Sequence, residues 1–219
     1  MNWLDFLKKG TSVGEAGAIE VNTPTRLEIP LFPLSAVLFP GGVLSLKVFE
    51  QRYLDMAAAC MKDGKPFGIC LIASGEETGA AAEPHSVGTL AEIGDWEMEQ
   101  LGILQINARG GRRFRILEKR LGPAQLLEAR VEIIADNGPL AVPAERQRLL
   151  PLLRRVVGDL GRERIPEPHR YDDAEWVGYR ITEILPIQNL AKQKLLELED
   201  PLARLEILEK FLDQRKLLD

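Results

Sequence analysis

The chain has 219 residues, with 28 lysines and arginines against 33 aspartates and glutamates, which gives a formal net charge of −5. Hydrophobic residues make up 45% of the chain and charged residues 28%, which are ordinary values for a globular protein and exclude wholesale disorder and a fibrous repeat. The acidic balance also disfavours a domain whose main task is to bind a polyanion.

The cysteines and the N-terminal sequence predict a cytoplasmic location. Cys60 and Cys70 are too few for a disulfide framework, and neither lies in a Cys-x-x-Cys motif or a Cys/His cluster. Residues 1–9 place their charges after a very short apolar stretch, which is the reverse of a signal peptide. No run approaches the roughly 18 apolar residues of a membrane-spanning helix, so we expect no membrane segment.

Residues 1–25 are expected to form a flexible lead-in to the folded part of the chain. Residues 10–25 are rich in Gly, Thr, Ser, Ala and Pro and show no periodicity. They follow a short amphipathic turn that would present Trp3, Phe6 and Leu7 on one side.

Residues 26–137 have the character of a strand-rich subdomain with one helix. Strict alternation between Leu127 and Ile133 predicts a strand with one apolar and one polar face. Apolar residues at helical spacing from Tyr53 to Met61 predict a helix that ends at Gly64, and they give Cys60 a packing role. The other segments with strand character are Leu27–Leu31, Val43–Val48, Phe67–Ile72, Val87–Ile93, Ile103–Ala108 and Phe114–Leu117.

Residues 138–219 are predicted to form a helical subdomain of three or four helices. The change to helical periodicity follows a strong turn signal at Asp136–Pro139. Asp172 stands three residues before Glu175, which is capping-box spacing, and Asp200–Pro201 reads as an N-cap followed by proline at the first helical position. An apolar stripe comes earlier, and in it Pro151 must start or kink a helix: Leu149, Leu152, Leu153, Val156 and Leu160.

The motifs of common enzyme classes are absent. The sequence has no phosphate-binding or dinucleotide-binding glycine motif, and no serine lies in a Gly-x-Ser-x-Gly elbow. His85 and His169 are interpreted as solvated loop residues, because neither has a second His or Cys at metal-ligand spacing. We therefore expect no catalytic residue, metal or cofactor.

A basic run is the one segment that hints at nucleic acid. It contains Arg109, Arg112, Arg113 and Arg115 with Phe114 among them. Strand alternation puts Phe114 on one face and both Arg113 and Arg115 on the other, so a charged outer strand face explains the run without a ligand. RNA binding stays open as an alternative that would use these four arginines.

The stretches LFPLSAVLFPG (31–41) and LKVFEQRY (46–53) closely resemble the opening of the Lon protease N-terminal (LON substrate-binding) domain family. In this chain Gln51 and Ser45 replace prolines that are common in the family. The resemblance spans about residues 27–212, with further matches at Phe67–Ile72, Val87–Ile93, Gly110, Arg113–Ile116, Trp176, Leu185–Pro186, Lys192–Glu197 and Arg204–Leu205.

The resemblance implies an α+β fold, in which a strand-rich, partly open PUA-like barrel with one inserted helix precedes a C-terminal helical subdomain. It implies a binding role, because this domain is associated with recognising protein substrates in Lon proteases and serves as a protein-docking scaffold in cereblon. No ATPase or protease domain follows before Asp219, so we expect a stand-alone LON domain.

We therefore expect a non-catalytic module that binds unfolded or extended protein segments, or a partner such as a separate protease or scaffold. RNA binding through the PUA-like barrel is the alternative, and a peptidase in its own right is a third possibility without a catalytic motif to support it. Neither a membrane nor nucleic acid is the expected partner. The sequence leaves the identity of the client and the oligomeric state open.

Three residues of the resembling motif are candidates for a partner contact. Glu50, Arg52 and Tyr53 put charges beside an aromatic ring at a strand-to-helix junction, where they would either lock the two subdomains together or face a partner. A buried ion pair is the expected role of Arg52. The apolar residues of the motif, with Phe39 and Phe49 among them, are expected to be core.

Overall fold

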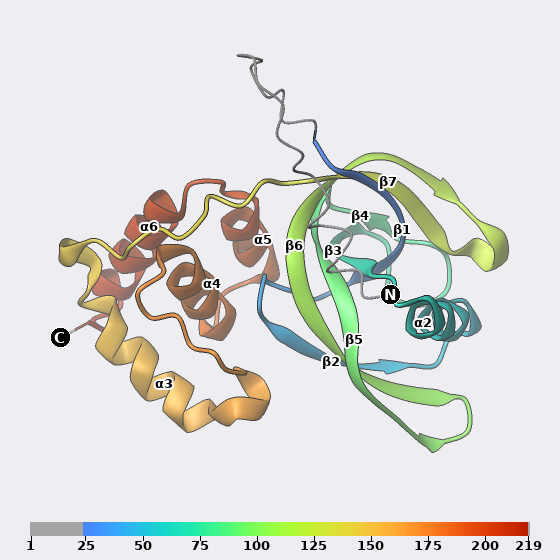
Figure 1. Cartoon of the computed structure of the whole chain (residues 1–219), viewed down its shortest axis with the longest axis horizontal. Helices are drawn as coiled ribbons and strands as arrows, with labels where there is room; N and C mark the ends of the chain where they lie inside the picture. Colours follow the sequence, from blue (N-terminus) through green and yellow to red (C-terminus); the bar gives the residue numbers. More distant parts are fainter. Residues whose placement is uncertain (1–23, 219) are drawn as a thin grey trace, which may run out of the picture.

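A strand-rich half and a helical half lie side by side in the computed structural model, which describes residues 24–218 (Figure 1). The predicted lead-in, apart from Pro24 and Thr25, lies outside the described residues. The barrel half contains β1 (Arg26–Leu34), β2 (Val43–Val48), α2 (Gln51–Asp63), β3 (Phe67–Ser74), β4 (Glu83–Pro84), β5 (Val87–Gln100), β6 (Ile103–Leu121), the 3-10 turn η1 (Pro123–Gln125) and β7 (Leu127–Ile133). The helical half contains the 3-10 turn η2 (Ala144–Arg146), α3 (Leu149–Arg164), α4 (Ala174–Ile184), α5 (Asn189–Glu197) and α6 (Pro201–Gln214).

The strands form a barrel that closes only because β1 changes partner. Pairing runs through β1, β7, β6, β5 and β3. Residues Arg26–Pro30 of β1 pair with β7, whereas Leu31–Leu34 pair in parallel with β3. The N-terminal half of β1 therefore lies apart from β3, and the barrel is partly open at this split, as the predicted fold class requires.

Two predicted strands are a single long strand. Segments expected at Ile103–Ala108 and Phe114–Leu117 join as β6, which runs through Gly110. A Cβ atom at Gly110 would lie 2.2 Å from the carbonyl oxygen of Phe39, while the Gly110 amide donates to the Gly42 carbonyl at 2.8 Å. Glycine is needed here because the turn at residues 39–42 packs directly on the strand.

The helix predicted after the second strand is confirmed as α2. Gly64 ends it with a left-handed φ of 61°. One core assignment near it is wrong: Phe49 is 58% exposed, because it follows the last residue of β2 and points away from the barrel core that Val48 enters. Strand alternation explains this, since neighbouring side chains point to opposite faces.

The helical half contains four α-helices, of which α6 begins as predicted. The Asp200 carboxylate accepts the Leu202 amide at 2.8 Å, and Pro201 follows it. The cap of α4 differs from the prediction, because Asp173 rather than Asp172 accepts the Glu175 amide, at 3.0 Å. The helix begins one residue later than the capping-box spacing suggests.

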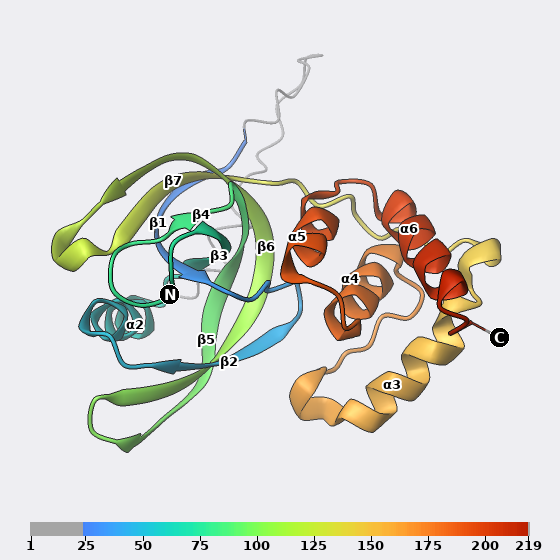
Figure 2. The same ribbon diagram turned by 180° about the vertical axis from the view of Figure 1, so that it is seen from behind.

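Each half has its own core, and a small apolar cluster joins the halves. Leu140 and Val142, which follow β7, already pack in the helical core. Phe39, Tyr179 and Leu196 are buried together where the turn after β1 meets α4 and α5. Figure 2 shows α5 beside β6, and α5 also contacts β3 and β5, so these strands form the barrel surface on which the helices pack. Within residues 24–218, no helix is both long enough and apolar enough to cross a bilayer.

Candidate functional site

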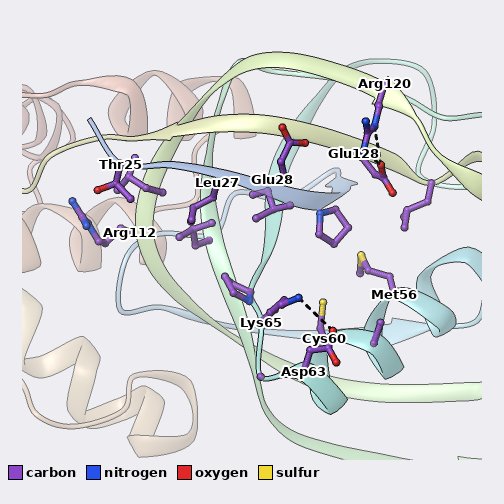
Figure 3. Close-up of a pocket in the computed structure, with 18 residues that line it drawn as sticks. Thr25, Leu27, Glu28, Met56, Cys60, Asp63, Lys65, Arg112, Arg120 and Glu128 are labelled. Carbon is purple, nitrogen blue, oxygen red and sulfur yellow. Dashed lines mark hydrogen bonds and ion pairs between the residues drawn. The ribbon is translucent and has the colours of Figure 1, made fainter. Parts of the chain in front are cut away.

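A cavity of about 630 Å³ opens at the split of the barrel, between β1 and α2 (Figure 3). Leu27 and Ile29 line one wall, and Met56 and Cys60 line the other. Its lining also includes Leu90, which belongs to the barrel core. The cavity exists because the first half of β1 follows β7 and leaves the side of β3, so that apolar core surface is open to the outside.

The rim of the cavity carries balanced charge. Three acidic and three basic side chains line it, namely Glu28, Asp63, Glu128, Lys65, Arg112 and Arg120. Arg120 pairs with Glu128 at 2.9 Å, and Lys65 pairs with Asp63 at 3.5 Å. The rim therefore has no net charge with which to select an ion, and the interior suits an uncharged apolar group.

A short stretch of β1 beside the cavity has a free main-chain edge within the described residues. The Ile133 amide donates to the Thr25 carbonyl at 2.9 Å, and the register continues with Leu27 opposite Val131. Because main-chain groups alternate between the two edges of an antiparallel strand, those of Arg26 and Glu28 are directed away from β7. Pro30, which has no amide hydrogen, ends this edge.

Cys60 lines the cavity as an inert thiol. Burial raises the pKa of Cys60 to about 11, so the group is protonated at neutral pH. Burial also raises the pKa of Cys70, which is enclosed in the barrel core. The packing role that the sequence predicts for Cys60 agrees with this environment.

Glu50, Arg52 and Tyr53 lie at the start of α2, on the barrel. Arg52 is buried and its Nη2 lies 2.9 Å from the Glu50 carboxylate, so the expected ion pair is present. Arg52 Nη1 also donates to the Gln125 carbonyl at 3.3 Å, while the Tyr53 ring stacks on Phe32 with 4.1 Å between centroids. These contacts tie α2 to the rest of the barrel and do not reach the helical half. A partner contact by these residues stays a prediction.

Other polar side chains join the two halves. Arg113 donates to the carbonyl oxygens of Leu196 at 2.8 Å and Leu198 at 3.0 Å. Gln193 of α5 donates to the Val87 carbonyl at 3.0 Å. The outer-face interpretation of Arg113 is therefore wrong, because α5 covers that face of β6 and leaves the side chain 3% exposed.

Two further arginines are buried, Arg180 with a contact across this junction and Arg204 beside it within the helical half. Arg180 donates to the Pro40 carbonyl at 2.9 Å and lies 3.2 Å from the Glu183 carboxylate. Arg204 donates to the Leu195 carbonyl at 2.9 Å and lies over the Tyr179 ring at 4.2 Å. Burial lowers the pKa of both arginines, although the neighbouring acceptors keep the charged form.

Sequence reasoning did not assign these residues to the junction, although a signal was available. Arg113, Gln193 and Arg204 all fall inside stretches that resemble the family, but Arg113 and Gln193 lie beside charged residues, and of the three Arg204 alone interrupts an apolar run, between Ala203 and Leu205. A polar residue at such a position indicates a buried hydrogen bond.

The four arginines of the basic run do not form one surface. Arg112 pairs with Asp136 at 3.4 Å, Arg115 pairs with Glu199 at 3.2 Å, and Arg113 is buried under α5. Arg109 is exposed and stands opposite Glu92 in the β5 register. The four arginines therefore contact different parts of the protein and do not form a continuous basic surface.

The histidines are less solvated than predicted. His169 bonds to the Ile165 carbonyl at 3.1 Å and packs 5.8 Å from Trp176, and His85 lies 4.0 Å from Glu197. Both are half-buried because aromatic or charged neighbours from the helices cover them. In the described residues no group of three or more His, Cys, Asp or Glu side chains could hold a metal ion.

The chain is thus an α+β domain in which a partly open barrel with an apolar cavity is joined to a helical half. Comparison with known families identifies this domain: the chain belongs to the family of the ATP-dependent protease La (LON) substrate-binding domain, whose model matches residues 28–214. The resemblance seen in the sequence is thereby confirmed.

The relatives are much longer proteins. The chain is 28% identical over 165 residues to the Lon protease of Anaeromyxobacter dehalogenans, covering 70% of this chain and 20% of that protein. It is 29% identical over 201 residues to Lon protease 2 of Herpetosiphon aurantiacus, covering 86% and 24% respectively. The chain thus spans about a fifth to a quarter of these curated relatives.

Solved structures support the same fold. The Lon N-terminal domain protein from Xanthomonas campestris superimposes with a TM-score of 0.71 at 34% identity, covering 84% of this chain and 98% of that one. The N-terminal domain of the Mycobacterium avium complex Lon protease gives a TM-score of 0.60 at 21% identity, covering 85% of this chain and 97% of that one. At this level of identity the similarity is evidence for the fold and not for the function.

Proposed function

We propose that this chain is a non-catalytic protein-binding module that holds unfolded or extended segments of other proteins at the cavity between β1 and α2. The observation that carries the proposal is an apolar cavity of about 630 Å³ beside a free strand edge, in a domain of the LON substrate-binding family. Lon proteases are named for proteolysis, and the family model for substrate binding, so the transferable role is recognition.

The geometry supports an extended client. A client backbone would pair with the main-chain groups of Arg26 and Glu28, and an apolar side chain would enter between Ile29 and Met56. Two or three main-chain hydrogen bonds and one buried side chain must offset the cost of ordering the client. Affinity is therefore expected to be modest and broad in sequence preference.

RNA binding gains no support from the described residues. The cationic groups that motivated it are buried, paired or separated, and the net charge of −5 opposes phosphate binding. An RNA oligomer accordingly serves as a control ligand.

The test is fluorescence anisotropy of a labelled, permanently unfolded polypeptide titrated with the whole chain. The matched variants are Ala59→Arg, which fills the cavity mouth from an exposed position of α2, and Ala58→Arg, which puts the same side chain on the same helix away from the cavity. We expect binding of the unfolded polypeptide that Ala59→Arg weakens at least tenfold and Ala58→Arg leaves unchanged.

The folded counterpart of the polypeptide and the RNA oligomer should give no signal in the same buffer. Circular dichroism of both variants checks that they keep the fold. Absence of binding to the unfolded polypeptide, or equal effects of the two arginines, would overturn the proposal.

A further inference from the structure

The hairpin of β5 and β6 projects beyond the barrel and away from the helical half (Figures 1 and 2). We call residues 92–107 the arm. The pairing of β5 with β3 ends at Ala91, opposite Phe67, so that from Glu92 onward β5 pairs only with β6. The outer edge of β5 is therefore free along the arm in the described structure, whereas Leu104 and Ile106 of β6 are buried in the barrel core and pair with β2.

Large apolar side chains are exposed along the arm. Trp96 is 59% exposed, Met98 45% and Leu101 94%. Trp96 stands directly opposite Ile106, which is a core residue of the barrel. The arm therefore continues the apolar inner face of the barrel into solvent, and exposed tryptophan is typical of an interaction surface.

The arm also carries negative charge with no counter-charge of its own. Residues 87–108 contain Glu92, Asp95, Glu97 and Glu99 but no lysine, arginine or histidine. Carboxylates on neighbouring strands are paired across the sheet, such as Glu128 with Arg120 at 2.9 Å. By contrast, Asp95 and Glu97 make no ion pair with any described residue, so they are available to an outside cation, whereas Glu92 stands opposite Arg109.

Acidic and apolar residues alternate at the middle of the arm. Glu97 stands opposite Gln105 on the outer face, while the neighbouring Trp96 stands opposite Ile106. Asp95, Trp96 and Glu97 also line a hollow of about 420 Å³ against β2 and β6, in which Lys47 is the one basic side chain, so the two carboxylates leave the lining acidic. A ligand that lies along the arm would meet carboxylates and apolar surface within two residues of each other.

We propose that the arm is a docking surface for a basic segment of a partner protein in which arginine or lysine alternates with large apolar residues. The apolar residues of that segment contact Trp96, Met98 and Leu101, and its cations pair with Asp95 and Glu97. This surface shares no residue with the cavity at β1 and α2, so it gives the module a second, chemically different face.

A labelled hexapeptide of alternating arginine and leucine, titrated against the whole chain by anisotropy, tests the proposal. A hexapeptide of alternating glutamate and leucine is the probe of opposite charge. We expect Trp96→Ala to weaken binding of the arginine peptide at least fivefold, and Asp95→Asn with Glu97→Gln to weaken it at least tenfold and flatten its salt dependence. The glutamate peptide should not bind.

Asp159→Asn with Glu163→Gln is the matched control, because it removes the same charge from exposed positions of α3 that make no ion pair in the described structure. Equal weakening by this control would reduce the effect to net charge and overturn the proposal, as would an unchanged affinity of Trp96→Ala. Self-association of the Asp95/Glu97 variant in sedimentation, with peptide binding intact, would show that the carboxylates only protect an exposed edge.

The cavity variant Ala59→Arg separates this proposal from the proposed function. It should leave the affinity for the arginine peptide unchanged while it blocks the unfolded polypeptide. Loss of both ligands in Ala59→Arg would place the peptide in the cavity and overturn the assignment to the arm.

Discussion

Single buried arginines decide how the two halves are joined. Arg113 and Arg180 are at most 3% exposed, and each donates across the junction to a main-chain carbonyl oxygen, of Leu196 and of Pro40 respectively. A guanidinium group suits this role because its planar fork of donors satisfies several carbonyls at once and is weakly hydrated. Burying a guanidinium charge is unfavourable unless its hydrogen bonds are made, so the loss of any of these contacts should be strongly destabilising.

Arg113 provides the residue-scale prediction. Arg113→Ala should lower the free energy of unfolding by about 3 kcal/mol, because it leaves the Leu196 carbonyl without its donor, leaves Arg204 as the remaining donor to the Leu198 carbonyl, and opens a void under α5. Arg109→Ala, on the exposed face of the same strand, should change it by about 0.5 kcal/mol or less. Urea unfolding measures both changes in the free energy of unfolding. Equal losses in the two variants would contradict a role of Arg113 in joining the two halves.

At the scale of elements, the turn at residues 39–42 determines where β6 can lie. The Gly41 amide donates to the Gly110 carbonyl and the Gly110 amide to the Gly42 carbonyl, both at 2.8 Å. The turn also carries Phe39 onto Tyr179, with 5.7 Å between the ring centroids. One turn therefore contacts both the barrel and the helices, which explains why the family resemblance is densest there.

Alanine substitution at Gly110 tests this interpretation of the turn, and the same substitution at Gly158 is the comparison. Gly110→Ala should cost about 3 kcal/mol or more, because the new Cβ would meet the rigid Phe39 carbonyl at 2.2 Å. Gly158→Ala should stabilise the protein by about 0.5–1 kcal/mol, because this glycine lies inside α3 with no atom within 4 Å of its Cβ position. Thermal and urea unfolding give both values; a tolerated Gly110→Ala would mean that the turn moves freely.

At the scale of the whole molecule, the halves should unfold together. Hydrogen bonds from Arg113, Arg180 and Gln193 cross between them, and the Phe39 cluster lies at their junction. Neither half keeps these polar groups satisfied alone. Loss of one half therefore leaves buried donors and acceptors unpaired in the other, which makes intermediates costly.

A two-probe urea titration tests the cooperativity. Trp176, in the helical core, reports by fluorescence in a variant with Trp3→Phe and Trp96→Phe. Cys70, in the barrel core, reports by pulse labelling of its thiol in a variant with Cys60→Ala. The two midpoints should coincide within about 0.2 M urea. Separate midpoints would show that the halves unfold independently.

Local features were predictable because they depend on neighbouring residues. The alternation from Leu127 to Ile133 depends on strand geometry, the end of α2 on the left-handed glycine at position 64, and the start of α6 on Asp200. The family resemblance depended on a long motif of such features. Together they were sufficient for the fold class and for the family.

Only the tertiary structure decided which surfaces are covered and which are open. Alternation placed Arg113 correctly on the face opposite Phe114, but it could not show that α5 covers that face. The cavity likewise depends on β1 exchanging β7 for β3 at Pro30, which is a relation between strands far apart in sequence. Periodicity reports the two faces of an element, whereas burial and pockets depend on what other elements place against them.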